Sequence, residues 1–289
     1  MSNLSKFFVP LVLAGVLFSF NIILADSSEY QTEENIFYYN DECYQTADDY
    51  QRQQCRLDLY YPKNESAFST VVWFHGGGLT GGKRYFPDLL KDRGIAVVAV
   101  EYRLSPQVEF PKFLEDAAAA VAWTFQNIER FGGDRSKIFV CGGSAGAYLT
   151  AMVGMDPRWL NPYHIKQQEL AGLILVSGQV TTHFHIKKLL KIPGEQYQPV
   201  IDENAPLAYL SSDLPPILLV LGDRKMEWKA RVEENELMFA SLKALGHSCI
   251  DFIETPGMGH EISALGNNIP IETQQKIIDF LRLNPIEKP

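Results

Sequence analysis

Short apolar runs and amphipathic stretches alternate along most of the chain. Compact or alternating apolar runs predict strands, and apolar positions that recur every three or four residues predict helices. The predicted strands are residues 55–61, 70–74, 95–101, 138–141, 171–176, 216–221 and 249–253, and the predicted helices begin at residues 111, 145, 231 and 272. Strands that alternate with helices pair in parallel and are covered on both faces. The pattern therefore predicts an α/β fold, a doubly wound domain with a mostly parallel sheet.

The first 25 residues have the pattern of a signal peptide. Lys6 lies in a short leading region, an apolar run extends from Phe7 to Leu24, and Ala25 offers a small residue for cleavage. We expect an exported protein whose single domain covers residues 26–289. An uncleaved membrane anchor is the less favoured alternative, because the run is at the short limit for a membrane-spanning helix. No later run is long enough to predict another span.

Residues 177–213 do not fit the alternation of strands and helices. This stretch carries aromatic residues, prolines and mixed charges. In α/β sheets, ligands bind beyond the carboxyl ends of the strands. We expect the stretch to be an insertion that covers these ends as a lid, with the apolar side chains of Phe184, Leu189, Leu190 and Tyr197 closing over a bound ligand.

Charge narrows the range of partners. The formal net charge is −9, and removing the first 25 residues, which hold one lysine and no acid, leaves 25 basic and 35 acidic residues, or −10. A clearly acidic surface without a basic run argues against nucleic acid and against anionic membranes as partners. The net charge does not argue for or against a neutral substrate.

The four cysteines have different surroundings. Cys43 and Cys55 lie in a polar stretch, where an oxidising compartment would allow a disulfide between them; two free thiols are the alternative. Cys141 and Cys249 alternate with apolar residues and are predicted to be core thiols. Their spacings match no metal-site pattern, so no metal site is predicted from them.

The segment Gly142-Gly143-Ser144-Ala145-Gly146 joins a predicted strand to a predicted helix. A serine at the tip of such a sharp turn is held in a strained backbone conformation, and the residues two before and two after it must be small. Gly142 and Gly146 meet this need. Ser144 is the candidate nucleophile, and the alternative is a glycine-rich turn with an incidental serine.

Three consecutive glycines follow His75 and the strand 70–74. Their amides can turn inward without side chains that would block a substrate. We assign oxyanion donors to Gly77 and Gly78, joined by the amide of Ala145 at the helix start, with Gly76 as the fallback. His75 is placed to brace this loop from below.

His260 is the candidate base. It follows the last predicted strand in a flexible turn, from which a histidine can reach the end of another strand. The alternative is an exposed loop histidine without a catalytic role. His183 and His185 have a spacing that would suit a metal pair, but no third ligand accompanies them, so no metal is predicted.

The triad acid should lie in the loop after the strand 216–221. Asp223 is next to the strand end and would serve to shape the loop through hydrogen bonds to its own backbone. Glu227 reaches further out and precedes Trp228, which can shield a pair of histidine and carboxylate from water. We favour Glu227 and keep Asp223 as the alternative. The order serine, acid, histidine is that of α/β-hydrolases.

Taken together, these motifs resemble a carboxylesterase of the α/β-hydrolase superfamily, in the group of hormone-sensitive-lipase-like and feruloyl-esterase-like proteins. The likeness covers roughly residues 57–283 and rests on His75-Gly76-Gly77-Gly78, Tyr102-Arg103-Leu104-Ser105-Pro106, Phe110-Pro111, Asp116, Gly133-Asp134 and Gly142 to Gly146. The resemblance implies ester hydrolysis without a cofactor. It agrees with the roles argued above for Ser144, His260 and the glycine loop.

The sequence departs from that family pattern at two positions. Ala147 stands where many relatives have a further glycine, and Lys225 stands where relatives often carry an aspartate. The second departure leaves Glu227 as a preference. The expected substrate is a small-molecule ester or an ester linked to polysaccharide. A peptidase or an acyltransferase on the same scaffold, and a non-catalytic binding protein that kept the fold, are the alternatives.

Overall fold

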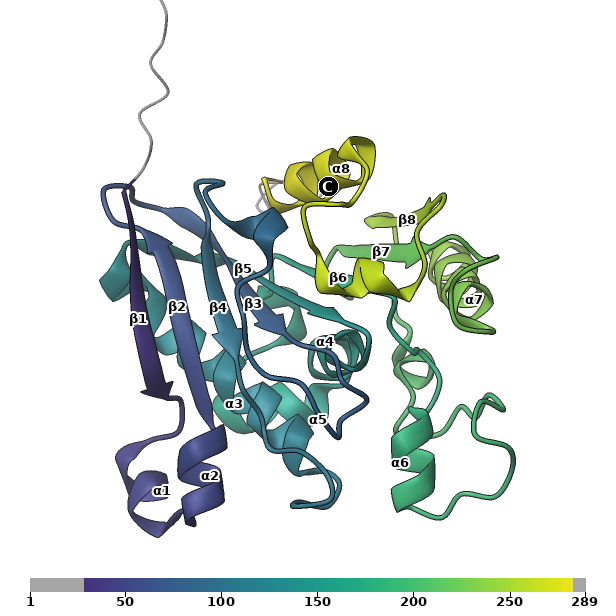
Figure 1. Ribbon diagram of the computed structural model, residues 1–289, viewed down its shortest axis with the longest axis horizontal. Helices are drawn as coiled ribbons and strands as arrows, with labels where there is room; N and C mark the ends of the chain where they lie inside the picture. The colour runs from purple at the N-terminus through teal and green to yellow at the C-terminus, as the bar shows by residue number, and fades with distance from the viewer. Residues whose placement is uncertain (1–28, 283–289) are drawn as a thin grey trace, which may run out of the picture.

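The computed structural model describes residues 29–282, which form an eight-stranded sheet with helices on both faces (Figure 1). The strands are β1 (Tyr30–Phe37), β2 (Arg56–Pro62), β3 (Phe68–Phe74), β4 (Ala96–Val100), β5 (Gly133–Gly143), β6 (Gly172–Val176), β7 (Ile217–Gly222) and β8 (Ile250–Thr255). Their order across the sheet is β1-β2-β4-β3-β5-β6-β7-β8. All seven predicted strands are present, and the predicted α/β fold class is confirmed.

The sheet is mixed at one edge. β1 pairs antiparallel with β2, and β2 pairs antiparallel with β4, whereas the pairs from β4 through β8 are parallel. The sequence pattern did not predict β1. None of its residues is buried, so the strand lacks the apolar face that marks a strand in sequence.

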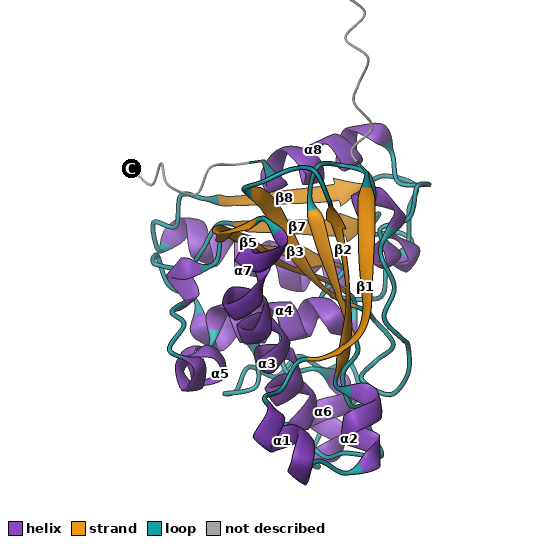
Figure 2. Ribbon diagram, turned by 90° about the vertical axis from the view of Figure 1, so that its left-hand side faces the viewer, coloured by secondary structure: helices purple, strands orange, loops and turns teal. Residues whose placement is uncertain are grey.

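The helices are α1 (Asp41–Thr46), α2 (Asp49–Gln54), α3 (Lys112–Asn127), α4 (Ala145–Met155), α5 (Pro157–Leu160), α6 (Phe184–Leu189), α7 (Arg231–Ala244) and α8 (Ile271–Leu281). Figure 2 shows α3, α4 and α7 on one side of the sheet and α8 on the other. Within residues 29–282, no helix has the length and apolar character needed to cross a membrane. The predicted signal peptide and its anchor alternative lie outside the described residues.

Two apolar clusters form the core, one on each face of the sheet. Val72 and Phe74 of β3 point into the cluster that contains α3 and α4, whereas Val71 and Trp73 point into the cluster that contains α8. This alternation is the strand period of two, expressed on a sheet that is buried on both faces. The core therefore fixes β3 and β5, the two strands that lead into the predicted site.

The structure has free thiols at Cys43 and Cys55, one of the two alternatives left open, and it contradicts the prediction for Cys249. All four cysteines are free, so Cys43 and Cys55 form no disulfide. The Cys55 side chain is buried in the core, and burial, followed by the charge of Asp116, raises the pKa of its thiol above the usual value. Cys249 is exposed rather than a core residue, because β8 begins only at Ile250.

Candidate active site

Ser144 occupies the tip of the turn between β5 and α4. Its φ of 55° and ψ of −116° place it in a region that L-residues rarely adopt. The Ser144 amide donates to the carbonyl of Val176 at 2.8 Å, which ties the turn to the end of β6. The serine therefore stands beyond the carboxyl ends of the central strands, where only 9% of its surface is exposed.

The glycines around Ser144 allow close packing of backbone on backbone. A Cβ atom added to Gly142 would lie 2.3 Å from the carbonyl carbon of Gly146, and one added to Gly146 would lie 2.0 Å from the Phe74 oxygen. Both positions therefore exclude a side chain, as the sequence predicted. A Cβ at Gly143 would lie 1.8 Å from the Ser263 oxygen, so this third glycine also fixes the distance to the histidine loop.

His260 lies between Ser144 and Glu227. Its Nε2 is 2.8 Å from the Ser144 Oγ, and its Nδ1 is 2.7 Å from the Glu227 Oε1. The three side chains come from the turn after β5, the loop after β7 and the short 3-10 turn His260–Ala264 after β8. The structure thus brings together the predicted nucleophile, the predicted base and the preferred acid in one hydrogen-bonded row.

The carboxylate of Glu227 is enclosed and saturated with donors. Besides His260, it accepts hydrogen bonds from the Ser177 hydroxyl and from the amide of Trp228. Burial by itself would raise the pKa of Glu227, but the hydrogen bonds from His260, Ser177 and the Trp228 amide outweigh it and lower that pKa. The group is therefore held as an anion.

Trp228 covers the outer side of this pair, as the sequence suggested. Its ring stacks on the His260 imidazole with the ring centroids 4.1 Å apart and the planes 14° apart. The stacking restricts rotation of the imidazole and removes water from one of its faces. Sequence reasoning missed Ser177, because a serine at the end of β6 carries no local signal of a contact 50 residues away.

Asp223, the alternative acid, does not contact His260. Its two carboxylate oxygens accept from the backbone amides of Lys225 and Gly257, at 2.9 and 3.1 Å. These backbone hydrogen bonds lower the pKa of Asp223. Asp223 therefore shapes its own loop and ties it to the loop that carries His260, and Glu227 is one helical turn further along, with its amide bonded to the Asp223 carbonyl.

The glycine loop after β3 lies against the nucleophile turn. A Cβ at Gly76 would be 3.2 Å from the Cβ of Ser144, so the two segments are in contact. Gly77 and Gly78 have φ values of 115° and 63°, which glycine adopts without strain. Within the described residues, the amides of Gly77 and Gly78 donate to no backbone carbonyl. Ala145, the third predicted donor, is the first residue of α4, whose first amides have no partner within the helix.

Comparison with known proteins agrees with this geometry. Residues 57–161 match the family model BD-FAE. Esterase B from Lactobacillus rhamnosis, solved with a tributyrin phosphonate inhibitor, covers 88% of this chain and 85% of its own at a TM-score of 0.69 and 21% identity. The chain has the α/β-hydrolase fold. A truncated carbohydrate esterase from gut microbiota has a TM-score of 0.65 at 17% identity, over 89% of this chain and 97% of its own.

Curated relatives of this chain include esterases from distant organisms. Esterase LipC of Mycobacterium tuberculosis is 24% identical over 73% of this chain and 55% of its own, and rat liver carboxylesterase B-1 is 32% identical over 43% and 25%. The chain spans about half or less of the length of these relatives. The match to BD-FAE confirms the resemblance to the feruloyl-esterase-like group that the motifs indicated.

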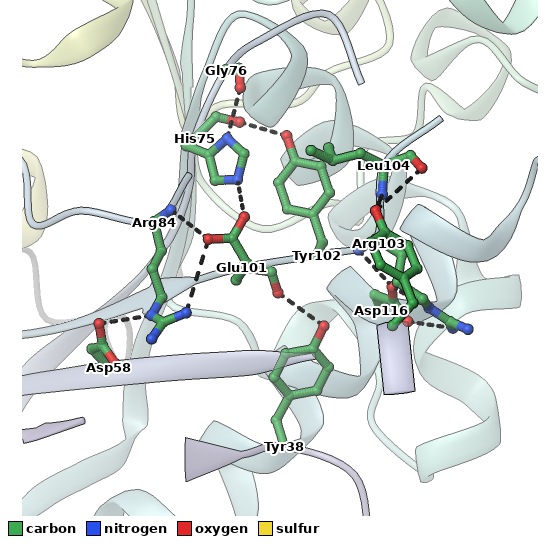
Figure 3. Close-up of polar contacts among 11 residues, drawn as sticks. Tyr38, Asp58, His75, Gly76, Arg84, Glu101, Tyr102, Arg103, Leu104 and Asp116 are labelled. Carbon is green, nitrogen blue, oxygen red and sulfur yellow. Dashed lines mark hydrogen bonds and ion pairs between the residues drawn. The ribbon is translucent and has the colours of Figure 1, made fainter. Parts of the chain in front are cut away.

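A buried polar network supports the glycine loop of the hydrolase from below (Figure 3). His75 Nδ1 is 2.7 Å from the Gly76 carbonyl, and its Nε2 is 3.2 Å from the Glu101 carboxylate. The other carboxylate oxygen of Glu101 accepts from the amide of Arg84, whose side chain also binds Asp58. Sequence analysis predicted the bracing role of His75 but not Glu101 or Arg84.

The His75 ring is held at both of its nitrogens. Its Nδ1 faces the Gly76 carbonyl oxygen and its Nε2 faces the Glu101 carboxylate, and the ring stacks on Tyr102 with 4.4 Å between the centroids. The Tyr102 hydroxyl in turn donates to the His75 carbonyl at 2.8 Å. The loop is therefore fixed by both the side chain and the backbone of His75.

The motif after β4 is anchored by a buried ion pair. The Arg103 guanidinium donates to both carboxylate oxygens of Asp116 on α3, and the Tyr39 hydroxyl donates to the same carboxylate. Two-point pairing of this kind fixes orientation as well as position. It holds the segment after β4, and with it Tyr102, against the helix layer.

The segment 177–213 lies beyond the carboxyl ends of the strands, with α6 below the sheet in Figure 1. The Phe184 ring lies 6.4 Å from Trp228 and 5.7 Å from Tyr197 between centroids. Among the residues predicted to close over a ligand, Phe184 therefore lies beside Trp228, which stacks on His260, whereas Leu190 is 43% exposed. His183 accepts from the amide of His185 and caps α6.

Proposed function

We propose that this α/β-hydrolase is a serine carboxylesterase that works through a covalent acyl-enzyme. The observation that carries the proposal is the hydrogen-bonded row from Ser144 through His260 to Glu227, at 2.8 and 2.7 Å, beside a loop of free glycine amides. A nucleophile, a base and an orienting acid in this order are what acyl transfer requires.

In the first half of the reaction, the Ser144 Oγ attacks the ester carbonyl while His260 Nε2 takes its proton. The carbonyl oxygen becomes an anion, which the amides of Gly77, Gly78 and Ala145 stabilise. Glu227 stabilises the imidazolium that forms. His260 then returns the proton to the leaving alcohol, and the carbonyl carbon remains bonded to Ser144.

In the second half, water replaces the alcohol. His260 takes a proton from the water as its oxygen attacks the acyl carbon, the same three amides stabilise the second oxyanion, and the bond to Ser144 breaks when His260 protonates the Oγ. No cofactor and no metal ion is required by this sequence of steps. The hydrogen bonds that Glu227 accepts from His260, Ser177 and the Trp228 amide keep the acid charged throughout, although its side chain is enclosed.

The relatives support an ester as substrate. Named esterases and carboxylesterases occur among the curated relatives, and carbohydrate esterases occur among the structural neighbours. With the predicted signal peptide, these likenesses favour an exported enzyme that removes acyl groups from small molecules or from polysaccharide.

The proposal is tested by hydrolysis of p-nitrophenyl esters of increasing chain length by the protein and by Ser144→Ala. We expect wild type to turn over, the variant to lose at least about 10⁴-fold in kcat, and a phosphonate to label Ser144 alone in mass spectrometry. Thermal unfolding of both proteins serves as the control for folding. Equal activity of the two proteins, or a label on another residue, would contradict the assignment.

A further inference from the structure

A cavity of about 620 Å³ lies between the glycine loop and α6. Its wall includes Thr80 from the glycine loop, and Phe184, His185, Lys187 and Lys188 from α6, and none of the residues that line it is acidic. The catalytic residues proposed above are not part of this wall. The cavity is therefore a separate space that nothing in the proposed mechanism uses.

The cavity adjoins the proposed oxyanion donors. A Cβ placed on Gly78 would lie 3.5 Å from the Phe184 ring and 3.8 Å from the Thr80 hydroxyl. Both of these residues belong to the cavity wall. Phe184 also lies beside Trp228, which stacks on His260, so two aromatic rings link the cavity wall to the imidazole. A substrate bound at Ser144 would extend past the Phe184 ring to enter the cavity.

Lys187 brings an incompletely satisfied positive charge to the wall. The residue is only 2% exposed, and its ammonium group donates to the carbonyls of Glu195 and Gln198, at 2.8 and 2.7 Å. An ammonium group has three N–H donors, so these two bonds leave one unused. Buried ammonium groups are usually paired with a carboxylate. No ion pair of Lys187 is formed within residues 29–282.

Lys188 adds a second positive charge, and this one is exposed. It likewise forms no ion pair with another described residue. His185 contributes no charge, because burial and then the nearby charge of Lys188 lower its pKa. The cavity is thus positive in a chain whose formal net charge is −9. A wall with two ammonium groups and no acid favours an anionic ligand.

We infer that this cavity binds a carboxylate that the ester substrate carries in addition to its scissile bond. The inference rests on the proposed esterase activity and names a class of substrate for the same site. The carboxylate can belong to the acyl part, as in a monoester of a dicarboxylic acid, or to the alcohol part, as in an acylated uronic acid. The exposed ammonium group of Lys188 would form an ion pair with this carboxylate. The unused N–H of the buried Lys187 would donate a hydrogen bond to it.

The first experiment compares kcat/KM for charged and neutral esters of the same shape. The mono-p-nitrophenyl ester of adipic acid is paired with p-nitrophenyl hexanoate, and 4-acetoxyphenylacetate is paired with 4-methylphenyl acetate. We expect the charged member to be preferred by roughly 10-fold in one pair, the size of one partly exposed charge-assisted hydrogen bond. The pair that shows the preference identifies which part of the substrate carries the carboxylate.

Variants at the end of α6 and just after it provide the matched control. Lys188→Gln should bring the ratio of charged to neutral substrate close to one, and Lys188→Arg should keep it. Lys191→Gln removes one positive charge from a residue that is not part of the cavity wall, and should leave the ratio unchanged. The inference is overturned if neither pair shows a preference for the charged member, or if Lys188→Gln and Lys191→Gln lower the ratio equally.

A binding measurement separates this inference from the proposed activity. Ser144→Ala lacks the proposed nucleophile, so it should bind an ester without turning it over. Binding of monomethyl adipate to this variant is measured by calorimetry, with methyl hexanoate as the neutral control. We expect Lys188→Gln in this background to weaken the binding of monomethyl adipate about 10-fold. If wild type hydrolyses no ester, the proposed function fails, and absence of binding of monomethyl adipate overturns the anion site independently.

Discussion

Replacing Glu227 by glutamine removes a charge while keeping every hydrogen bond. The Glu227 Oε1 accepts from His260 and from the Trp228 amide, whereas the Oε2 accepts only from the Ser177 hydroxyl. A glutamine oxygen can replace Oε1, and its amide nitrogen can donate to Ser177, because a hydroxyl can turn to accept. Glu227→Gln therefore isolates the electrostatic part of the contribution of the acid.

The size of this contribution follows from the geometry. The imidazolium of His260 forms only as the reaction proceeds, 2.7 Å from an oxygen of Glu227, whose side chain is fully enclosed. Charge centres about 4 Å apart interact by about 4 kcal/mol at an effective dielectric constant of about 20. We expect kcat to fall by roughly 10³-fold, with a small change in KM, since the interaction is gained in the transition state and not on substrate binding.

Asp223→Asn is the matched control. We expect this variant to lose stability but to keep most of its kcat. Each carboxylate oxygen of Asp223 accepts from a different backbone amide, of Lys225 and of Gly257. Asparagine can accept only one of these bonds, so the variant should unfold at a lower urea concentration than wild type and lose less than about 10-fold in kcat. Steady-state kinetics and urea unfolding measure both quantities. If Asp223→Asn loses as much kcat as Glu227→Gln, the assignment of the acid is wrong.

The pH dependence of stability gives a second measure of the same interaction. The pKa of Glu227 is lowered in the folded protein, chiefly by hydrogen bonds that outweigh its burial. A group with a depressed folded pKa adds stability above its unfolded pKa, and this stability is lost as the pH falls through the folded pKa. The free energy of unfolding of wild type should therefore fall more steeply below about pH 4 than that of Glu227→Gln. If the unfolding free energies of wild type and Glu227→Gln changed equally with pH, the reasoning would be refuted.

Three further changes test single contacts. Ser177→Ala removes a hydroxyl that donates to Glu227 and should lower kcat by about 5- to 10-fold in steady-state assays. Gly143→Ala would place a Cβ 1.8 Å from the Ser263 oxygen, so we expect a loss of at least about 3 kcal/mol in urea unfolding, with displacement of the histidine loop. Cys249 should react first with a thiol reagent in the native protein, and reducing agent should leave the melting temperature unchanged, because no disulfide is present.

The order of strands and helices could be read from the sequence because burial on both faces leaves a clear apolar signal. β3, β4 and β7 are almost entirely buried, and each was predicted within one or two residues. α1, α2 and β1 were not predicted, because none of their residues is buried. Where an element contributes no buried side chain, its sequence carries no periodicity that could reveal it.

The two carboxylates after β7 show where sequence reasoning on the site ends. Asp223 and Glu227 belong to one short loop, and either of them could reach a histidine after β8. The turn between the two residues determines which carboxylate reaches the histidine. It places the Glu227 side chain under Trp228 and against His260, and it leaves Asp223 bonded to backbone amides. Spacing along the chain does not determine this difference in direction.

The support of the glycine loop could not be predicted for a different reason. His75 has an evident position after β3, but its partner Glu101 follows β4, and Arg84, which binds Glu101 through its amide, lies between the two strands. Parallel pairing of β3 with β4 brings these residues together at the same edge of the sheet. The result is a glycine loop held by residues from two strands and from the segment between them, an arrangement that depends on how the strands pair and that the sequence of neither strand reveals by itself.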